Sequence, residues 1–155
     1  QQRLGYPLVD MDHAIEERAG KPITAIFADD GEPAFRDMET ALLRELNDPQ
    51  APRRIISTGG GVVGRAENRV LLKDLGYVVW LYAPPATVLE RTSKNRNRPL
   101  LRTDNPAAKI EALMAEREPL YQETAHLKLD TTGLRCDEVA TGILECARYF
   151  FTSHA

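Results

Sequence analysis

Two aspartates, three successive glycines and several arginines are the residues of this 155-residue sequence whose types and spacing could support chemistry. Asp10 and Asp12 are two residues apart, so on an extended segment their side chains would point the same way. Paired carboxylates suit a magnesium site together with a base or a hydroxyl acceptor. The alternative is that Asp12 only caps the helix that follows, since aspartate is a common N-cap residue.

The glycines Gly59, Gly60 and Gly61 follow an apolar segment and form a second candidate. Glycines let the backbone approach a ligand closely and present N–H donors without side chains. Such a run suits a phosphate, a hydroxylated ligand or a carboxylated ligand. It can equally be a tight turn that binds nothing.

Arginines in three places could bind an anion. Arg36 lies three residues before Glu39, which either forms a surface ion pair with it or holds its guanidinium to grip a carboxylate. Arg117 stands at an expected helix end, where compensation of the helix dipole is the alternative to anion binding. Arg98 belongs to the basic stretch 91–102, which is either a solvated loop or a lid over a site.

The elements that must position these residues alternate between short apolar runs and helical stretches. Periodicity predicts strands at 8–10, 54–58, 77–82 and 127–130, helices at 14–19, 22–28, 32–46, 68–75, 85–91, 106–116 and 137–151, and a loop at 93–104. Gly20 is expected to end the helix at 14–19. Alternation of this kind predicts right-handed βαβ units, a parallel sheet and the α/β class. Ligands in such folds bind beyond the carboxyl ends of strands, and both the aspartates and the glycines follow a strand.

Composition and charge narrow the classes of protein that fit. With 43% hydrophobic and 28% charged residues, the chain is expected to form one globular domain. Its longest apolar run, 77–83, is far shorter than the ~20 residues that span a bilayer. The net charge of −3 argues against a general nucleic-acid binder. Cys136 and Cys146 lack metal-ligand spacing, and we expect them to be reduced in a cytosolic protein.

Residues 1–5 are typical of the tail of a helix that Gly5 caps, and a helix in this position normally follows a strand. No strand precedes it in the sequence shown. We therefore expect the natural protein to extend upstream of Gln1 with a strand that completes the sheet.

Five segments, taken in their order and spacing, resemble the shikimate kinase family over about residues 4–150. They are Asp10-Met11-Asp12, Phe35-Arg36-Asp37-Met38-Glu39, Ser57-Thr58-Gly59-Gly60-Gly61 with Asn68-Arg69, Arg98-Pro99-Leu100-Leu101, and Arg117-Glu118-Pro119-Leu120-Tyr121. The resemblance implies a single domain over 1–155 with a three-layer P-loop kinase fold, a parallel sheet flanked by helices. It also implies a substrate-binding subdomain at 14–50 and a lid at 93–105.

The function implied by the resemblance is that of shikimate kinase. The enzyme would transfer the γ-phosphoryl group of ATP, with Mg²⁺, to the 3-hydroxyl of shikimate, in the biosynthesis of chorismate and aromatic amino acids. It would be a cytoplasmic monomer without nucleic-acid or membrane partners. The alternatives are another small-metabolite P-loop kinase, such as a gluconate-kinase-like enzyme, and a kinase-like domain that binds without catalysis.

The resemblance also assigns roles around the transferred group. Asp12 would accept a hydrogen bond from the shikimate hydroxyl and act as base or orienter. Asp10 would help to hold Mg²⁺ through water. Arg98 would reach from the lid to the transferring phosphoryl group, and Arg91 would lie near the adenine.

On the substrate side, the resemblance implies that Arg36 and Arg117 clamp the shikimate carboxylate. Gly59, Gly60 and Gly61 would line the same pocket.

One departure from the family pattern is large. The family carries a phosphate-binding loop of the form G-x-x-x-x-G-K-[ST], and no such stretch occurs in these 155 residues. The family places that loop upstream of the position of Gln1. We therefore expect the 155 residues alone to be inactive, and the complete enzyme to be a kinase.

Overall fold

The structure is a computed structural model that describes residues 3–93 and 104–153. The chain forms two compact units, Gln1–Leu75 and Gly76–Ala155, and each is described by itself. The lid expected at 93–105 falls almost wholly outside the described residues.

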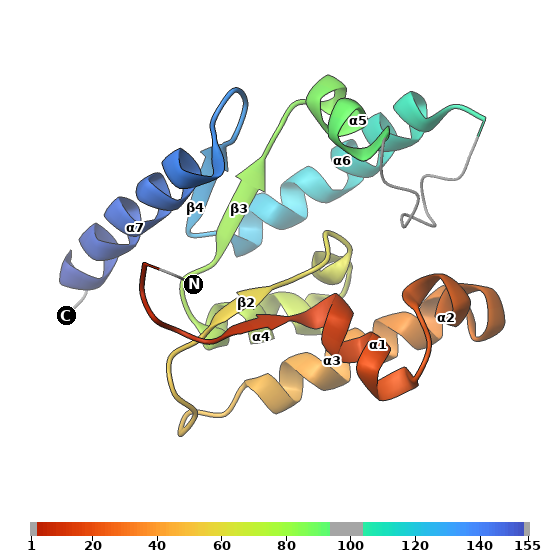
Figure 1. Cartoon of the computed structure of the whole chain (residues 1–155), viewed down its shortest axis with the longest axis horizontal. Helices are drawn as coiled ribbons and strands as arrows, with labels where there is room; N and C mark the ends of the chain where they lie inside the picture. The colour runs from red at the N-terminus through yellow and green to blue at the C-terminus, as the bar shows by residue number, and fades with distance from the viewer. Residues whose placement is uncertain (1–2, 94–103, 154–155) are drawn as a thin grey trace. The chain divides into compact units, whose positions relative to one another are not determined.

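The first unit places two parallel strands beside a group of helices (Figure 1). Its elements are β1 (Leu8–Asp10), α1 (Met11–Ala19), α2 (Ile23–Asp29), α3 (Gly31–Leu46), β2 (Ile55–Ser57), a short 3-10 helix (Val62–Gly64) and α4 (Ala66–Leu75). The parallel register pairs Leu8 with Ile55 and Asp10 with Ser57. The two strands therefore end side by side, and the residues that follow them share one edge.

Helical periodicity in the first unit produces its core. In α3 the apolar positions recur every three or four residues, so one stripe of the helix turns inward. The buried apolar side chains of the unit are Met11, Ile15, Ile26, Phe35, Leu42, Leu43, Leu46, Val62, Val63 and Leu72. Helix α1 ends at Gly20, which adopts φ 67° as a left-handed cap, as the sequence predicts. This core fixes α1 and α3 relative to the strand ends.

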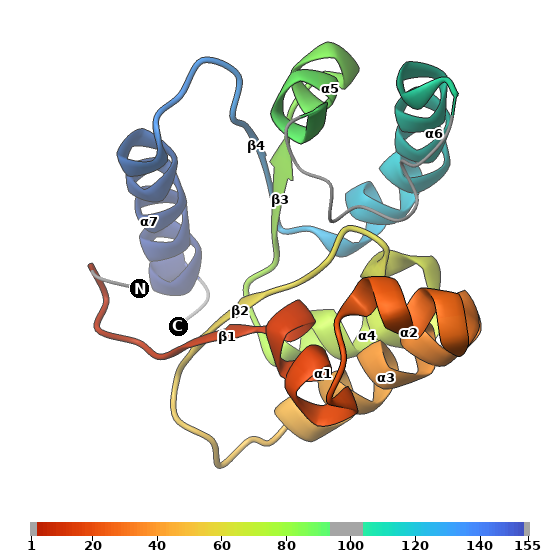
Figure 2. The same ribbon diagram turned by 45° about the vertical axis from the view of Figure 1, so that its right-hand side comes forward.

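The second unit is built on another parallel pair, with Val79 opposite Leu127 and Tyr82 opposite Asp130. Its elements are β3 (Val79–Tyr82), α5 (Pro85–Ser93), α6 (Pro106–Thr124), β4 (Leu127–Asp130) and α7 (Cys136–Ser153). Figures 1 and 2 show α7 on one side of the strand pair and α5 with α6 on the other. Helices on both faces are typical of parallel strands.

Helix α6 is longer than the sequence predicts. The expected end at residue 116 is wrong, because the helix continues through Pro119 to Thr124. A proline inside a helix costs about 3 kcal/mol relative to alanine. The end of the helix is held by Tyr121, whose ring stacks on Trp80 of β3 at 5.3 Å between centroids.

The α/β class is confirmed, and the strands and helices predicted between residues 8 and 151 are present in the predicted order. The described strands form two separate parallel pairs, β1–β2 and β3–β4. Several ends shift: the strand expected at 54–58 is Ile55–Ser57, and that at 77–82 is Val79–Tyr82. Among the described helices, none has the length and apolar character needed to cross a membrane.

Candidate active site

Both polar segments of the first unit begin where a strand ends. Because Asp10 pairs with Ser57, the residues two positions further on, Asp12 and Gly59, lie at the same edge of the strand pair. This register brings together the aspartates and the glycines that the sequence placed far apart.

Asp10, and not Asp12, caps the helix that follows β1. The Asp10 carboxylate accepts a hydrogen bond from the backbone N–H of His13 at 3.2 Å. The chain turns helical at Met11, so the expectation that both aspartates sit on an extended segment is wrong. Asp12 lies in the first turn of α1, where a carboxylate also interacts favourably with the helix dipole.

The Asp12 carboxylate faces the first glycine of the turn. A Cβ atom at position 59 would lie 3.3 Å from Asp12 Oδ1 and 3.5 Å from Glu39 Oε1. Gly59 is therefore the point at which carboxylates from α1 and α3 converge on the β2 edge.

Arg36 is held on α3 by two carboxylates. Its Nη1 donates to Glu39 Oε2 at 2.5 Å, and its Nη2 and Nε donate to Glu32 Oε1 at 2.9 and 3.2 Å. Glu39 is buried, so its pairing with Arg36 is not the surface ion pair that the spacing also allowed. Burial alone would lower the pKa of the Arg36 guanidinium. Hydrogen bonds and charge from Glu39 and Glu32 outweigh burial and raise this pKa above its usual value.

The last glycine of the turn lies against that guanidinium. A Cβ atom at Gly61 would clash with Nη1, Nη2 and Cζ of Arg36. The φ of Gly61 is −83°, a value open to any residue, so the close approach and not the backbone conformation demands glycine here. The glycine run is therefore more than a turn: its backbone forms one wall beside Arg36.

Glu32 is a site residue that the sequence reasoning missed. It stands four residues before Arg36, and this spacing on a helix was a signal that could have identified it. The missed contact matters because it fixes the second edge of the guanidinium.

In the second unit, Arg91 joins helix α5 to the end of β4. It donates to Thr131 Oγ1 and to the Thr131 carbonyl, both at 2.9 Å. The Thr131 hydroxyl in turn donates to the Tyr82 carbonyl at 2.9 Å, at the end of β3. Arg91 thus lies at the carboxyl edge of this strand pair, and Thr131 is a partner that no sequence pattern indicated.

The other two predicted arginines are placed differently. Arg117 lies seven residues before the end of α6 at Thr124, so compensation of the C-terminal dipole does not explain it. Arg98 lies outside the described residues.

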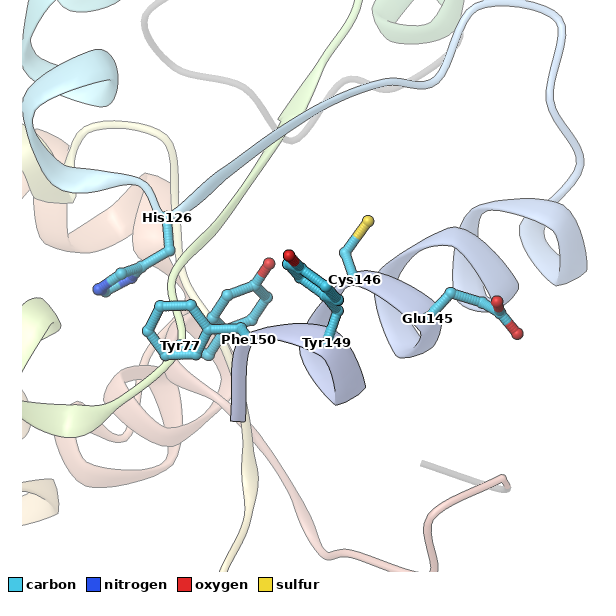
Figure 3. Close-up of a pocket in the computed structure, with 6 residues that line it drawn as sticks. All are labelled: Tyr77, His126, Glu145, Cys146, Tyr149 and Phe150. Atoms are coloured by element: carbon cyan, nitrogen blue, oxygen red, sulfur yellow. The ribbon is translucent and has the colours of Figure 1, made fainter. Parts of the chain in front are cut away.

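None of the residues that line a hollow of about 430 Å³ in the second unit is a predicted site residue (Figure 3). The ring of Tyr77 packs on Phe150 at 4.8 Å between centroids, and His126 Nδ1 accepts the Val78 N–H at 3.0 Å. The hollow is lined by Tyr77, His126, Glu145, Cys146, Tyr149 and Phe150.

Comparison with known proteins gives a consistent result. The family described as "Shikimate kinase" matches residues 1–148. Shikimate kinase of Thioalkalivibrio sulfidiphilus is 45% identical over 147 residues, which cover 95% of this chain and 75% of that protein. Shikimate kinase of Neisseria meningitidis serogroup C is 46% identical over 134 residues, with coverages of 86% and 78%.

Solved structures agree with these relatives. The shikimate kinase from Acinetobacter baumannii, solved in complex with shikimate, superposes with a TM-score of 0.89 at 40% identity, over 94% of this chain and 80% of that one. The enzyme from Aquifex aeolicus gives a TM-score of 0.76 at 32% identity, over 92% and 82%.

Proposed function

Since this chain belongs to the shikimate kinase family, which transfers the γ-phosphoryl group of ATP to shikimate, we propose that Asp12, Arg36 and glycines 59–61 form its shikimate site. The supporting observation is the position of Arg36, between Glu32 and Glu39 and against Gly61. A guanidinium carries five N–H donors, so Nη1 and Nη2 keep donors for a carboxylate after these pairs are made.

Asp12 is the proposed acceptor for the reacting hydroxyl. Its carboxylate is exposed and faces Gly59, close to Arg36's partner Glu39. A substrate whose carboxylate is bound by Arg36 would present a hydroxyl at the other end of its ring. Asp12 would orient that hydroxyl and take its proton as phosphoryl transfer proceeds.

Asp10 is the proposed magnesium residue. Mg²⁺ prefers one or two carboxylates together with waters and substrate phosphates, and Asp10 offers an exposed carboxylate at the strand edge. Within residues 3–93 and 104–153 no cluster of three or more acidic, histidine or cysteine ligands occurs. In this proposal Asp10 would be a single carboxylate ligand that acts on Mg²⁺ directly or through water. When bound, the ion would neutralise charge on the ATP phosphates.

Arginines complete the proposal. Arg117 would be the second residue on the shikimate carboxylate, and Arg98 would meet the transferring phosphoryl group from a lid at 93–105. Arg91 would bind the nucleotide at the carboxyl edge of β3 and β4, where its contacts with Thr131 hold it. The subdomain at 14–50, within a single domain over 1–155, would carry the shikimate site.

We also propose that the enzyme acts as a monomer in the cytoplasm. Free Cys136 and Cys146 fit a reducing compartment. Light scattering on the purified full-length gene product would give the mass of one chain if this is right, and a larger mass would refute it.

The test of the site uses the full-length gene product and a shikimate analogue whose carboxylate is replaced by a neutral amide. Because removal of Arg36 would take a cationic partner away from the buried Glu39 carboxylate, Arg36→Lys is the informative variant. A lost charge-assisted hydrogen bond is worth about 1.5–3 kcal/mol, so Arg36→Lys and Arg117→Ala should each weaken shikimate binding roughly ten- to a hundredfold.

The amide analogue supplies the control. The analogue should bind the wild-type enzyme poorly, and its affinity should fall little further in either variant. The affinity for ATP should stay unchanged in both. If the variants weaken the amide and shikimate equally, the arginines support the fold and the assignment of the site fails. Phosphorylation of gluconate in preference to shikimate would instead support the alternative small-metabolite kinase.

A further inference from the structure

The glycine turn and the Arg36 guanidinium lie in close contact. A single added methyl group at Gly61 would clash with the guanidinium. The distance between the turn and the guanidinium must therefore be set by contacts that hold the turn on one side and α3 on the other. Those contacts come from Arg65, just before helix α4, and from the first turn of that helix.

On the glycine side, α4 holds the backbone that follows the turn. Asn68 is fully buried, and its Nδ2 donates to the Val62 carbonyl at 2.9 Å. Arg69 Nη1 donates to the next carbonyl, that of Val63, at 3.0 Å. The short 3-10 helix is itself closed by a 3.0 Å hydrogen bond from Gly64 N–H to the Gly61 carbonyl. Asn68 thus fixes the segment that carries Gly61.

Burial of the Asn68 amide costs free energy, and its hydrogen bond to the Val62 carbonyl is the contact that offsets this cost. Its Oδ1 is buried and has no hydrogen-bond partner among the described residues. A buried amide group with an unsatisfied acceptor costs free energy. The side chain's evident contribution is therefore the donor that it aims at the Val62 carbonyl.

On the arginine side, Arg65, the residue just before α4, reaches the backbone of α3 through the side chain of Thr40. Arg65 Nη1 donates to Thr40 Oγ1 at 3.1 Å, and the buried Thr40 hydroxyl donates to the Arg36 carbonyl at 3.0 Å. Arg65 Nη2 also pairs with Asp37 at 2.7 Å. The backbone at Arg36 is therefore tied to the same helix start as the glycine turn.

We propose that Arg65 and Asn68 are positioning residues that set the distance between Gly61 and the Arg36 guanidinium, and so the fit of the substrate carboxylate. This inference rests on the proposed shikimate site. Neither residue is proposed to touch the substrate: each acts through a backbone carbonyl or through Thr40.

The experiment measures KM for shikimate and for ATP in the full-length gene product. Asn68→Ala and Arg65→Ala should each raise KM for shikimate about tenfold, the scale of one misplaced charge-assisted hydrogen bond, and leave KM for ATP unchanged. Arg65→Lys should recover part of the loss, because a lysine can keep the pair with Asp37. Lys73→Ala, at an exposed position of the same helix, is the matched control and should change neither KM.

A double variant that combines Asn68→Ala with Arg36→Lys distinguishes a positioning role from general support of the fold. In Arg36→Lys the planar fork is absent, so adding Asn68→Ala should raise KM for shikimate little further. A full tenfold rise in that background would overturn the proposal. Lower melting temperatures with an unchanged KM for shikimate would overturn it too. If Asn68→Ala does not fold, the same comparison of KM for shikimate is made with Arg65→Ala, at a partly exposed position.

Failure of the site itself would look different. If Arg36→Lys alone leaves KM for shikimate unchanged, the proposed shikimate site is wrong and this inference falls with it. If Arg36→Lys raises that KM while Asn68→Ala and Arg65→Ala do not, the site stands and only the positioning role is rejected.

Discussion

Contact between Arg36 and Gly61 is the residue-scale feature on which the proposed carboxylate recognition depends. The guanidinium is fixed at two edges by Glu32 and Glu39, and the Gly61 backbone lies in close contact with it. A planar, pre-organised fork loses little entropy when it binds a carboxylate. Position 61 must therefore lack a side chain, because a Cβ atom there would clash with the guanidinium.

Replacing Gly61 by alanine should therefore impair shikimate binding selectively. The added methyl group would push the Arg36 guanidinium aside, and we expect KM for shikimate to rise by roughly ten- to a hundredfold, the value of a charge-assisted hydrogen bond. Steady-state kinetics of the full-length gene product measures the change. Gly64→Ala is the control, because nothing lies within 4 Å of a Cβ at that position. Equal effects of the two substitutions would refute the steric explanation.

At the scale of elements, Asp10 at the junction of β1 and α1 has one observed role and one proposed role. Its side chain caps α1, and the same carboxylate is the proposed ligand of Mg²⁺. Substitutions that keep one property and remove the other can tell these roles apart.

Asp10→Ser should keep the cap and lose the charge, whereas Asp10→Ala should lose both. Loss of an N-cap costs about 1 kcal/mol, so only the alanine variant should show reduced stability in chemical denaturation. Both variants should need more Mg²⁺ for half-maximal activity. A serine variant with wild-type Mg²⁺ dependence would show that Asp10 serves the helix alone.

At the scale of the whole molecule, the described residues supply the shikimate side of the proposed chemistry more fully than the phosphate side. Asp12, Arg36 and the glycines lie within one compact unit and share one core. The phosphate-binding motif of the family does not occur in the 155 residues.

The 155-residue chain should therefore bind shikimate without transferring phosphate. A ligand present at 100 times its dissociation constant stabilises the folded state by about 2.7 kcal/mol, which a thermal shift would detect. Arg44→Ala, which removes only the exposed pair with Glu67, should keep this shift, and Arg36→Lys should reduce it. Shikimate phosphate formed by the isolated chain would contradict the expectation of inactivity.

Local pattern was sufficient for the order and type of the elements, because apolar periodicity and capping are properties of short segments. The alternation of strands and helices gave the α/β class, and Gly20 was correctly expected to end its helix. The ends of elements were predicted less well: the helical pattern ended at residue 116, whereas α6 continues through Pro119 to Thr124 and stacks the Tyr121 ring on Trp80.

The sequence by itself determined which residues are candidates for the chemistry: the two aspartates, the glycine run and Arg36 with Glu39. Only the tertiary structure decided how they are used. It made Asp10 the cap, buried Glu39 under Arg36 and brought Gly61 against the guanidinium. These outcomes depend on strand register and helix packing between segments far apart in the chain, and no local pattern of residue types encodes those distances.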